Sequence, residues 1–204
     1  MLHLSTVEPI TLGLLKELMT KSYLETFTLV GGTALSLQIG HRISIDLDLF
    51  STDIFDHVEL KEHLGNDFPN FHIDLARSNT LITRIMDVKV DFIRFKYGFN
   101  YPVVIENELR LANIGDIASM KLDAISGRGR KKDFFDLFFL LKSFSLPEML
   151  DLYKKKYQHT TIFHVIKSLS YFADAESDPD PYVFDKNLTW NRVKNAIKKE
   201  IKKL

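Results

Sequence analysis

The apolar residues of this chain change their spacing once, near Gly115, and that change limits the fold more than any other sequence feature. Before it, short runs alternate between apolar and polar residues, a pattern typical of half-buried strands. After it, apolar residues recur three and four positions apart, as on amphipathic helices. We therefore predict an α+β fold: a core with a mixed sheet and flanking helices in residues 1–114, and a helical region in 115–204 packed on that core.

The predicted elements follow from the same spacing and from the turn residues between them. Strands are expected at 27–30, 44–50, 71–76, 80–86, 88–95 and 109–113. Helices are expected from Pro9 to about Met19, after Gly32 with Thr33 as the cap, and at 57–68, 116–126 and 131–144. Beyond Pro147 the pattern is helical, interrupted by an acidic loop with two prolines at 174–181.

The composition excludes several kinds of site. The chain has 204 residues and no cysteine, which rules out disulfides, thiolate nucleophiles and cysteine-bound zinc. It contains no P-loop, dinucleotide-binding or nucleophile-elbow motif. No apolar run approaches the roughly 20 residues that span a bilayer, and the N-terminus lacks the layout of a signal peptide. We therefore expect a cytoplasmic protein that does not bind a membrane.

Two aspartates one residue apart lie on the strand predicted around Leu47. Asp46 and Asp48 would project from the same face about 7 Å apart, and at an effective dielectric near 20 they would repel by roughly 2 kcal/mol. The opposite face, with Ile45, Leu47 and Leu49, would join the core. A bound Mg²⁺ would relieve the repulsion, because hard cations prefer oxygen ligands. For an Asp-x-Asp pair alone, a solvated strand face is the alternative.

A third acid, Asp91, stands on the strand predicted at 88–95, where Val90 and Phe92 face the other way. Alone, Asp91 fits the exposed side of a hairpin. If its strand lies beside the first acidic strand, three carboxylates converge. Such a set can hold two metal ions about 3.5–4 Å apart, an arrangement that clamps both oxygens of a phosphoryl transfer.

A glycine doublet, Gly31-Gly32, joins a short strand to a short helix. Glycines let backbone N–H groups approach a ligand, and a helix N-terminus favours phosphate. Thr33 can cap this helix or touch a phosphate oxygen. A tight turn would suffice for an isolated pair, but this one lies 14 residues before Asp46, so that one nucleotide can reach both. Arg42 has two open roles: stabilising phosphate charge, or linking the acidic strand to the helical half.

A lysine and two aspartates mark the start of the helical half. Lys121 shares a helix face with apolar residues, where an ammonium needs a partner, an anion or a route to solvent. Asp133 and Asp136 lie beside an apolar stripe of the next helix. Because burying an unpaired Asp136 is costly, we expect it to pair with Lys121, Arg128 or Arg130. A structural role suits both acids better than direct catalysis.

The charges of the chain balance, with 27 basic and 27 acidic side chains, but they are unevenly placed. Residues 128–132 read RGRKK, and the tail 186–204 has seven lysines and arginines against Glu200 alone. Clustered cations of this kind can bind the phosphates of RNA in a salt-dependent way. The alternative is an ordinary solvated surface beside the acidic loop.

These motifs resemble a known family. LVGGTALSLQIGHRISIDLDLF is similar to the first motif of the DNA polymerase β-type nucleotidyltransferase superfamily. The Gly-His-Arg before the aspartates and IASMKLDAISGRGRKKDFFDLFFLL resemble the AbiEii/AbiGii-type toxins, and the resemblance covers roughly residues 9–142. It implies transfer of a nucleoside monophosphate from an NTP with loss of pyrophosphate, as the toxin of a toxin–antitoxin or abortive-infection phage-defence system.

Site residues follow from the resemblance position by position. Asp46 and Asp48 would be ligands of Mg²⁺, with two ions expected, and Asp91 the third carboxylate, placed to activate the acceptor hydroxyl. The expected NTP-binding residues are Gly31, Gly32, Thr33, Arg42, Lys121, Arg128 and Arg130. The acceptor is expected to be RNA such as tRNA, bound by the basic loop 128–132 and the tail 186–204, and a cognate antitoxin is an expected partner. The alternatives are nucleotidylation of a protein and a non-catalytic nucleotide- or RNA-binding module on the same fold.

Overall fold

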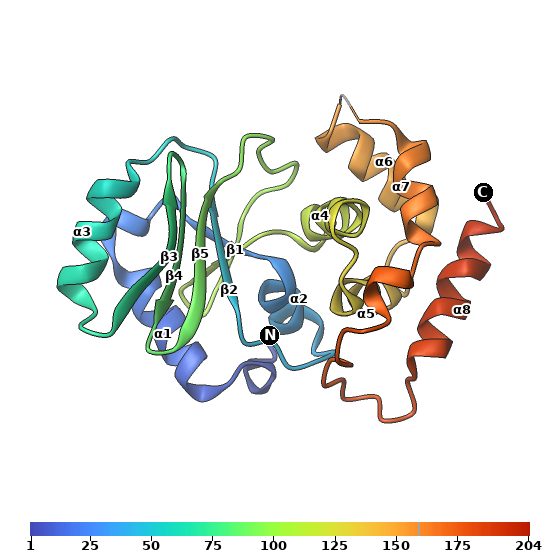
Figure 1. Cartoon of the computed structure of the whole chain (residues 1–204), viewed down its shortest axis with the longest axis horizontal. Coiled ribbons are helices and arrows are strands. Elements are labelled where there is room, and N and C mark those ends of the chain that lie inside the picture. Colours follow the sequence, from blue (N-terminus) through green and yellow to red (C-terminus); the bar gives the residue numbers. More distant parts are fainter. Residues whose placement is uncertain (159) are drawn as a thin grey trace. The chain divides into compact units, whose positions relative to one another are not determined.

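The computed structural model describes residues 1–158 and 160–204, which form two compact units (Figure 1). The N-terminal unit is Met1–Asn113 and the C-terminal unit is Ile114–Leu204. His159, in the stretch expected to be helical, lies outside the described residues. In the part of the chain that is described, no helix is both long and apolar enough to cross a membrane.

The N-terminal unit is built on a mixed sheet, which confirms the predicted α+β class. Over the described residues the sheet has seven strands in the spatial order β3-β4-β5-β2-β1-β7-β6. Their bounds are Thr28–Val30 (β1), Leu47–Ser51 (β2), Phe71–Arg77 (β3), Thr80–Ile85 (β4), Val88–Arg94 (β5), Val104–Glu106 (β6) and Leu109–Leu111 (β7). The pairs β2–β5 and β1–β7 are parallel, and the other neighbours are antiparallel.

Helices flank this sheet and make up most of the C-terminal unit. In the N-terminal unit they are α1 (Pro9–Thr20), α2 (Gly31–Ile39) and α3 (His57–Asp67), with short 3₁₀ turns η1 (Leu4–Thr6) and η2 (Ser22–Leu24). In the C-terminal unit they are α4 (Ile114–Gly127), α5 (Lys131–Leu140), α6 (Leu146–Lys156), α7 (Ile162–Leu169) and α8 (Trp190–Ile201), with a 3₁₀ turn η3 (Ala173–Ala175). The helix α2 packs on β1 and β2, the two strands that it connects.

The elements differ from the predictions in several places, and α5, predicted to reach residue 144, ends at Leu140. The acidic strand begins at Leu47, and Ile45, expected in the core, is 54% exposed. The strand β6 has only three residues and no glycine in the turn that follows it, so its sequence carries no clear strand signal. The connection between α7 and α8 runs from 170 to 189 and holds η3, which is longer than the predicted loop at 174–181.

One face of the central strands is apolar and fully buried. Leu47 and Leu49 on β2 are register partners of Val90 and Phe92 on β5, and all four are at most 1% exposed. Phe27 packs edge-on against Phe92, with ring centroids 5.5 Å apart. Burying a side chain of this size contributes about 1.5–3 kcal/mol, so the two strands are anchored by this face while the other face is left for polar residues.

Arg110 on β7 fixes the chain segment that leads into β1. Its guanidinium donates hydrogen bonds to the carbonyls of Met19, Leu24 and Phe27 at 2.9–3.0 Å. Burial lowers the pKa of Arg110. These carbonyls lie at the end of α1, at the end of η2 and just before β1, so one guanidinium connects three successive parts of the chain.

The C-terminal unit is held by aromatic packing and buried ion pairs. Trp190 on α8 lies 5.6–5.9 Å, between ring centroids, from Phe134, Phe135 and Phe172. Lys156 and Asp116 are both buried and their charged atoms are 2.6 Å apart. The helix α4 contacts α5, α6 and α7, which places it at the centre of this unit.

Candidate active site

The register of the sheet brings two of the predicted acids side by side. Asp48 on β2 and Asp91 on β5 are Cα partners in the parallel pair. Neighbouring strands lie about 4.8 Å apart, and register partners project from the same face. The two carboxylates are therefore adjacent on the face opposite Leu49 and Phe92, although 42 residues separate Asp48 from Asp91 along the chain.

Asp46 lies one residue before β2 and is held through its backbone. Thr33 Oγ1 donates a hydrogen bond to the carbonyl oxygen of Asp46, and it lies 2.8 Å from Ser44 Oγ. Ser44 in turn donates its backbone N–H to Thr6. The predicted capping role of Thr33 is wrong, because the N-cap of α2 is Val30 and Thr33 lies inside the helix. The threonine instead ties α2 to the segment that carries Asp46.

Gly31 meets a requirement that no other residue fulfils here. Its φ is +71°, in the left-handed region that strains residues with a Cβ. A Cβ at this position would also overlap the Oδ2 atom of Asp48. The Asp48 carboxylate thus lies directly against the start of α2, where the helix dipole favours a negative group. Gly31 is therefore needed for the close approach of the Asp48 carboxylate as well as for the turn.

Gly32 provides a similar close approach for a cation. A Cβ on Gly32 would overlap Nη2 of Arg42, and Nη1 of that buried arginine donates to the Ile43 carbonyl at 2.9 Å. A guanidinium and a helix N-terminus therefore lie together at the glycine turn. Both create positive potential, which suits an anionic ligand.

Asp91 is buried and only half satisfied. Its Oδ2 atom lies 2.5 Å from Nζ of Lys89, and its Oδ1 atom is buried and accepts no hydrogen bond from any described residue. An unpaired buried carboxylate oxygen beside a second carboxylate fits a hard cation, whose preferred ligands are oxygens. Over the described ranges, however, no set of three acidic or histidine side chains is arranged as ready-made metal ligands. The convergence of Asp46 with the other two acids remains a prediction.

Lys89 is a site residue that the sequence reasoning missed. It stands two positions before Asp91 on β5 and therefore on the same face of the strand. The alternation of Val90 and Phe92 orients Asp91, and the same alternation places Lys89 on the face of Asp91.

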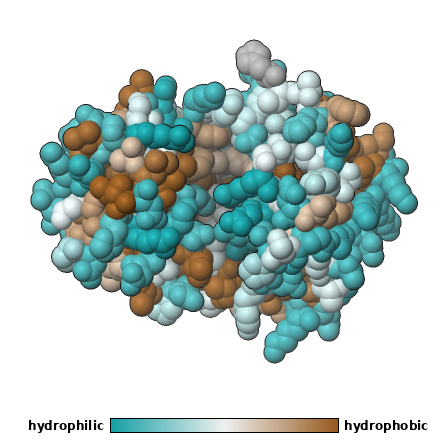
Figure 2. Space-filling view, in the orientation of Figure 1, coloured by the Kyte–Doolittle hydropathy of each residue, from teal (hydrophilic) through white to brown (hydrophobic). Residues whose placement is uncertain are grey.

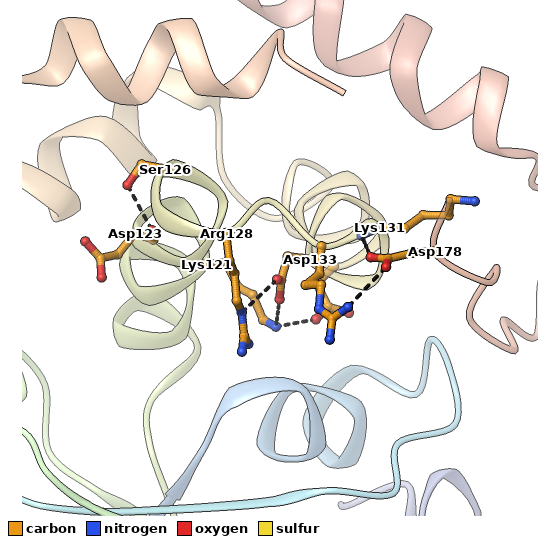
Figure 3. A network of polar contacts seen from close by, with 9 residues as sticks. Lys121, Asp123, Ser126, Arg128, Lys131, Asp133 and Asp178 are labelled. Carbon is orange, nitrogen blue, oxygen red and sulfur yellow. Dashed lines mark hydrogen bonds and ion pairs between the residues drawn. The ribbon is translucent and has the colours of Figure 1, made fainter. Parts of the chain in front are cut away.

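In the C-terminal unit, Lys121 lies between two buried aspartates (Figure 3). Its Nζ atom is 2.8 Å from Oδ1 of Asp133 and 2.6 Å from Oδ2 of Asp136. The lysine side chain is 7% exposed and both aspartate side chains are fully buried. The expected pairing of Asp136 with Lys121 is confirmed, and the pair joins α5 to α4.

The predicted basic loop is partly neutralised by the acidic loop 174–181. Nη1 of Arg130 lies 3.1 Å from Oδ1 of Asp178, and Nζ of Lys131 lies 3.1 Å from Oδ1 of Asp180. The backbone N–H of Lys131 donates to Asp178 at 3.0 Å and, with Arg130 nearby, lowers the pKa of that carboxyl. Figure 3 shows Asp178 facing the start of α5. Arg128, in contrast, is 66% exposed, with Nε 3.8 Å from Asp133.

The basic tail forms one amphipathic helix. Trp190, Val193 and Ile197 of α8 are buried, so the tryptophan serves packing and is not open to a base. Lys194 is paired with Glu176 at 2.7 Å, whereas Lys199 is exposed. Hydrophilic side chains cover much of the visible surface over α8 (Figure 2). The tail therefore offers a polar, partly cationic outer surface.

Comparison with known proteins extends this picture. The profile of the family described as "Nucleotidyl transferase AbiEii toxin, Type IV TA system" matches residues 13–203, a span that includes every candidate site residue above. The chain is 34% identical over 186 residues to the uncharacterized protein aq_aa25 of Aquifex aeolicus (strain VF5), covering 86% of both chains.

Two solved structures share the fold. JHP933 from Helicobacter pylori has a TM-score of 0.57 and 20% identity, with 96% of this chain and 92% of that one covered. MenT4, nucleotidyltransferase toxin Rv2826c from Mycobacterium tuberculosis H37Rv, has a TM-score of 0.59 and 13% identity, with 97% and 86% covered. At such identities the similarity establishes the fold alone.

Proposed function

Because this chain belongs to the AbiEii family of nucleotidyltransferase toxins of type IV toxin–antitoxin systems, we propose that it transfers a nucleoside monophosphate from an NTP to RNA in a Mg²⁺-dependent reaction. The observation that carries the proposal is the register of Asp48 with Asp91, next to Gly31 and with a buried carboxylate oxygen unpaired. A site that holds two acids together at a helix N-terminus suits a cation and a polyphosphate at once.

The roles of the residues follow from what each can donate or accept. Asp46, Asp48 and Asp91 would hold Mg²⁺, which when bound neutralises charge on the phosphates. The start of α2 at Gly31-Gly32 and the guanidinium of Arg42 would bind the phosphate oxygens. Their geometry is set before substrate arrives, because the glycine turn and the Thr33 hydrogen bond to Asp46 belong to the folded unit.

The proposed reaction is an in-line displacement at the α-phosphorus. The acceptor hydroxyl oxygen forms the new P–O bond while the bond to the β-phosphate oxygen breaks and pyrophosphate leaves. The hydroxyl proton passes to the Asp91 carboxylate, whose Oδ1 has no other hydrogen bond from the described residues. Positioning and charge stabilisation then provide most of the acceleration.

An RNA acceptor is favoured over a protein by the exposed cations of the C-terminal unit. Arg128 projects into solvent and the outer surface of α8 carries further lysines. The pairing of Arg130 and Lys131 with the acidic loop reduces the number of free cations, so we propose RNA binding through Arg128 and α8. Membership of a type IV toxin family also supports a cognate antitoxin as a partner.

The test is the double variant Asp46→Asn/Asp48→Asn, incubated with each α-labelled NTP in the presence of total RNA or cell lysate. Removing two of the three acids is expected to lower transfer at least about 10³-fold while the unfolding temperature stays close to that of the wild type. Asp53→Asn, which changes an exposed aspartate just after β2, is the matched control and should retain full activity.

Two outcomes would contradict the proposal. Transfer by the double variant at the wild-type rate would remove the assigned acids from the reaction. Label recovered in protein and absent from RNA would replace the RNA acceptor with a protein acceptor and leave the nucleotidyl transfer itself in place.

A further inference from the structure

Lys89 is a cation inside the acidic site, and the proposed reaction gives it no role. Its Nζ atom lies 2.5 Å from Oδ2 of Asp91, and its side chain is 37% exposed while that of Asp91 is 12% exposed. The ammonium is therefore partly accessible and reaches inward to a nearly buried carboxylate.

The surroundings of Lys89 hold the ammonium at Asp91. On β4 its register partner is Arg84, a like charge whose Nε lies 3.2 Å from Asp74. On the other side, the parallel register pairs Leu47 with Val90. Continued by one residue, that register leads from Lys89 toward Asp46. The lysine thus has a like charge beside it on β4, and the carboxylate at its ammonium is that of Asp91.

We propose that Lys89 is an internal counter-ion of Asp91 that a metal ion must displace, and that the released ammonium then binds the phosphates of the NTP. A Mg²⁺ ion bound to Oδ2 at about 2.0–2.1 Å would lie close to the ammonium, and the two cations would repel each other. A metal at Oδ1 would still be close to the ammonium and would be repelled by it. Lys89 therefore opposes metal binding in either position.

The NTP resolves this competition. Its triphosphate is strongly anionic, and the flexible four-carbon stem of a lysine lets the ammonium reach a new anion. Metal binding and triphosphate binding are then coupled. The triphosphate draws the ammonium away from the metal, and the metal frees the ammonium for the phosphates. The inference rests on the proposed function, since it takes the three acids as the metal site.

The test is Lys89→Met, with Mn²⁺ as the probe metal and inorganic tripolyphosphate as the probe anion. For Mn²⁺ alone, followed by electron paramagnetic resonance, the variant is expected to bind roughly five- to tenfold tighter than the wild type. For the Mn²⁺–tripolyphosphate complex, followed by calorimetry, it is expected to bind roughly five- to tenfold weaker, because a phosphate contact is lost. If Lys89 only supported the fold, its replacement would weaken binding of Mn²⁺ alone and of the Mn²⁺–tripolyphosphate complex.

Control variants separate charge from packing. Lys61→Met removes an exposed lysine of α3 and should change neither affinity. Lys89→Arg keeps the positive charge and should keep weak binding of Mn²⁺ alone. If Lys89→Met does not fold, Lys89→Gln provides the same measurement with a polar side chain.

The outcomes distinguish this inference from the proposed function. Unchanged or weaker binding of Mn²⁺ alone in Lys89→Met, with an active wild type, overturns the counter-ion role and leaves nucleotidyl transfer standing. Failure of the wild type to bind Mn²⁺ with or without tripolyphosphate overturns both. Tighter binding of Mn²⁺ alone together with weaker binding of the Mn²⁺–tripolyphosphate complex supports the counter-ion role and the assigned metal site.

Discussion

Two clusters in this molecule combine one lysine with neighbouring aspartates, and they differ in how far water reaches them. On the sheet, Lys89 is 37% exposed and touches one carboxylate whose second oxygen is unpaired within the described residues. Between α4 and α5, Lys121 is 7% exposed and contacts two fully buried carboxylates. The same residue types thus form an open site in one unit and a closed one in the other.

The difference indicates which cluster can exchange its cation. A buried ion pair cannot be opened without leaving an uncompensated charge, so the Lys121 cluster is suited to joining helices. In the Lys89–Asp91 pair the lysine is partly exposed, so its ammonium can move into water when another ion takes its place at the carboxylate. The sheet site has that property, and the absence of a side chain at Gly31 leaves room for its other acid, Asp48, against the start of α2. We therefore assign ligand exchange to the sheet and cohesion to the helices.

Replacing Lys121 provides the strongest test of this contrast. Lys121→Met leaves Asp133 and Asp136 buried without their shared cation, and the free energy of unfolding is expected to fall by about 3–5 kcal/mol. Urea unfolding followed by circular dichroism measures the change. The matched variant Lys89→Met removes the partly exposed partner of Asp91, and the free energy of unfolding should fall by no more than about 1–2 kcal/mol. Equal losses for the two variants would remove the distinction between an open and a closed cluster.

Gly31→Ala tests the open site from its other side. The alanine would have a left-handed backbone conformation, and its Cβ would overlap the Asp48 carboxylate. The expected loss in the free energy of unfolding is about 1–3 kcal/mol. Nucleotidyl transfer should fall far more than stability, because the carboxylate must move. Gly98→Ala is the control: Gly98 also has positive φ, but its Cβ would have open space, so it should lose some stability and keep activity. Transfer at wild-type level in Gly31→Ala would show that this close approach is unimportant.

Asp178→Asn has the smallest effect and depends on pH. The pKa of Asp178 is lowered first by the Lys131 backbone N–H and then by Arg130, so the charged form is favoured in the folded state. Its stabilising contribution is therefore present above the ordinary carboxyl pKa, near 3.9, and is lost as pH falls through the lower folded value. At pH 7 the variant should lose about 0.5–1 kcal/mol of stability, because the carboxylate charge that strengthens the Lys131 hydrogen bond and the Arg130 pair is removed.

Thermal unfolding of wild type and Asp178→Asn between pH 3 and pH 7 checks this. The two curves should approach each other at the acid end, and added salt should reduce the part due to Arg130. A difference that grows toward low pH would contradict the assigned sign.

Local patterns predicted much of the fold. The period-two runs located β2 to β5 and the 3.6-type spacing located α4 and α5, because strand and helix periodicity are set by backbone geometry, although β2 begins at Leu47 and α5 ends at Leu140. The errors lie where neighbours in space override sequence. Ile45 continues the alternation but lies outside β2, and Thr33 has the identity of a cap but bonds to Asp46. Ile45 belongs to the segment 44–46, which hydrogen bonds connect to Thr33 of α2 and to Thr6 of η1.

The amino-acid order was enough to place Asp48 on the polar side of a strand, to predict close backbone approach at the glycine turn before it, and to mark Lys121 as a cation that needs a partner, an anion or a route to solvent. These properties involve residues close together in the chain, where geometry leaves few choices. The partners were decided by folding: Asp91 beside Asp48, Lys89 on Asp91, and the acidic loop on the basic one. Pairing across such separations depends on sheet order and packing, since many alternative partners have the same charge and only the folded chain selects among them.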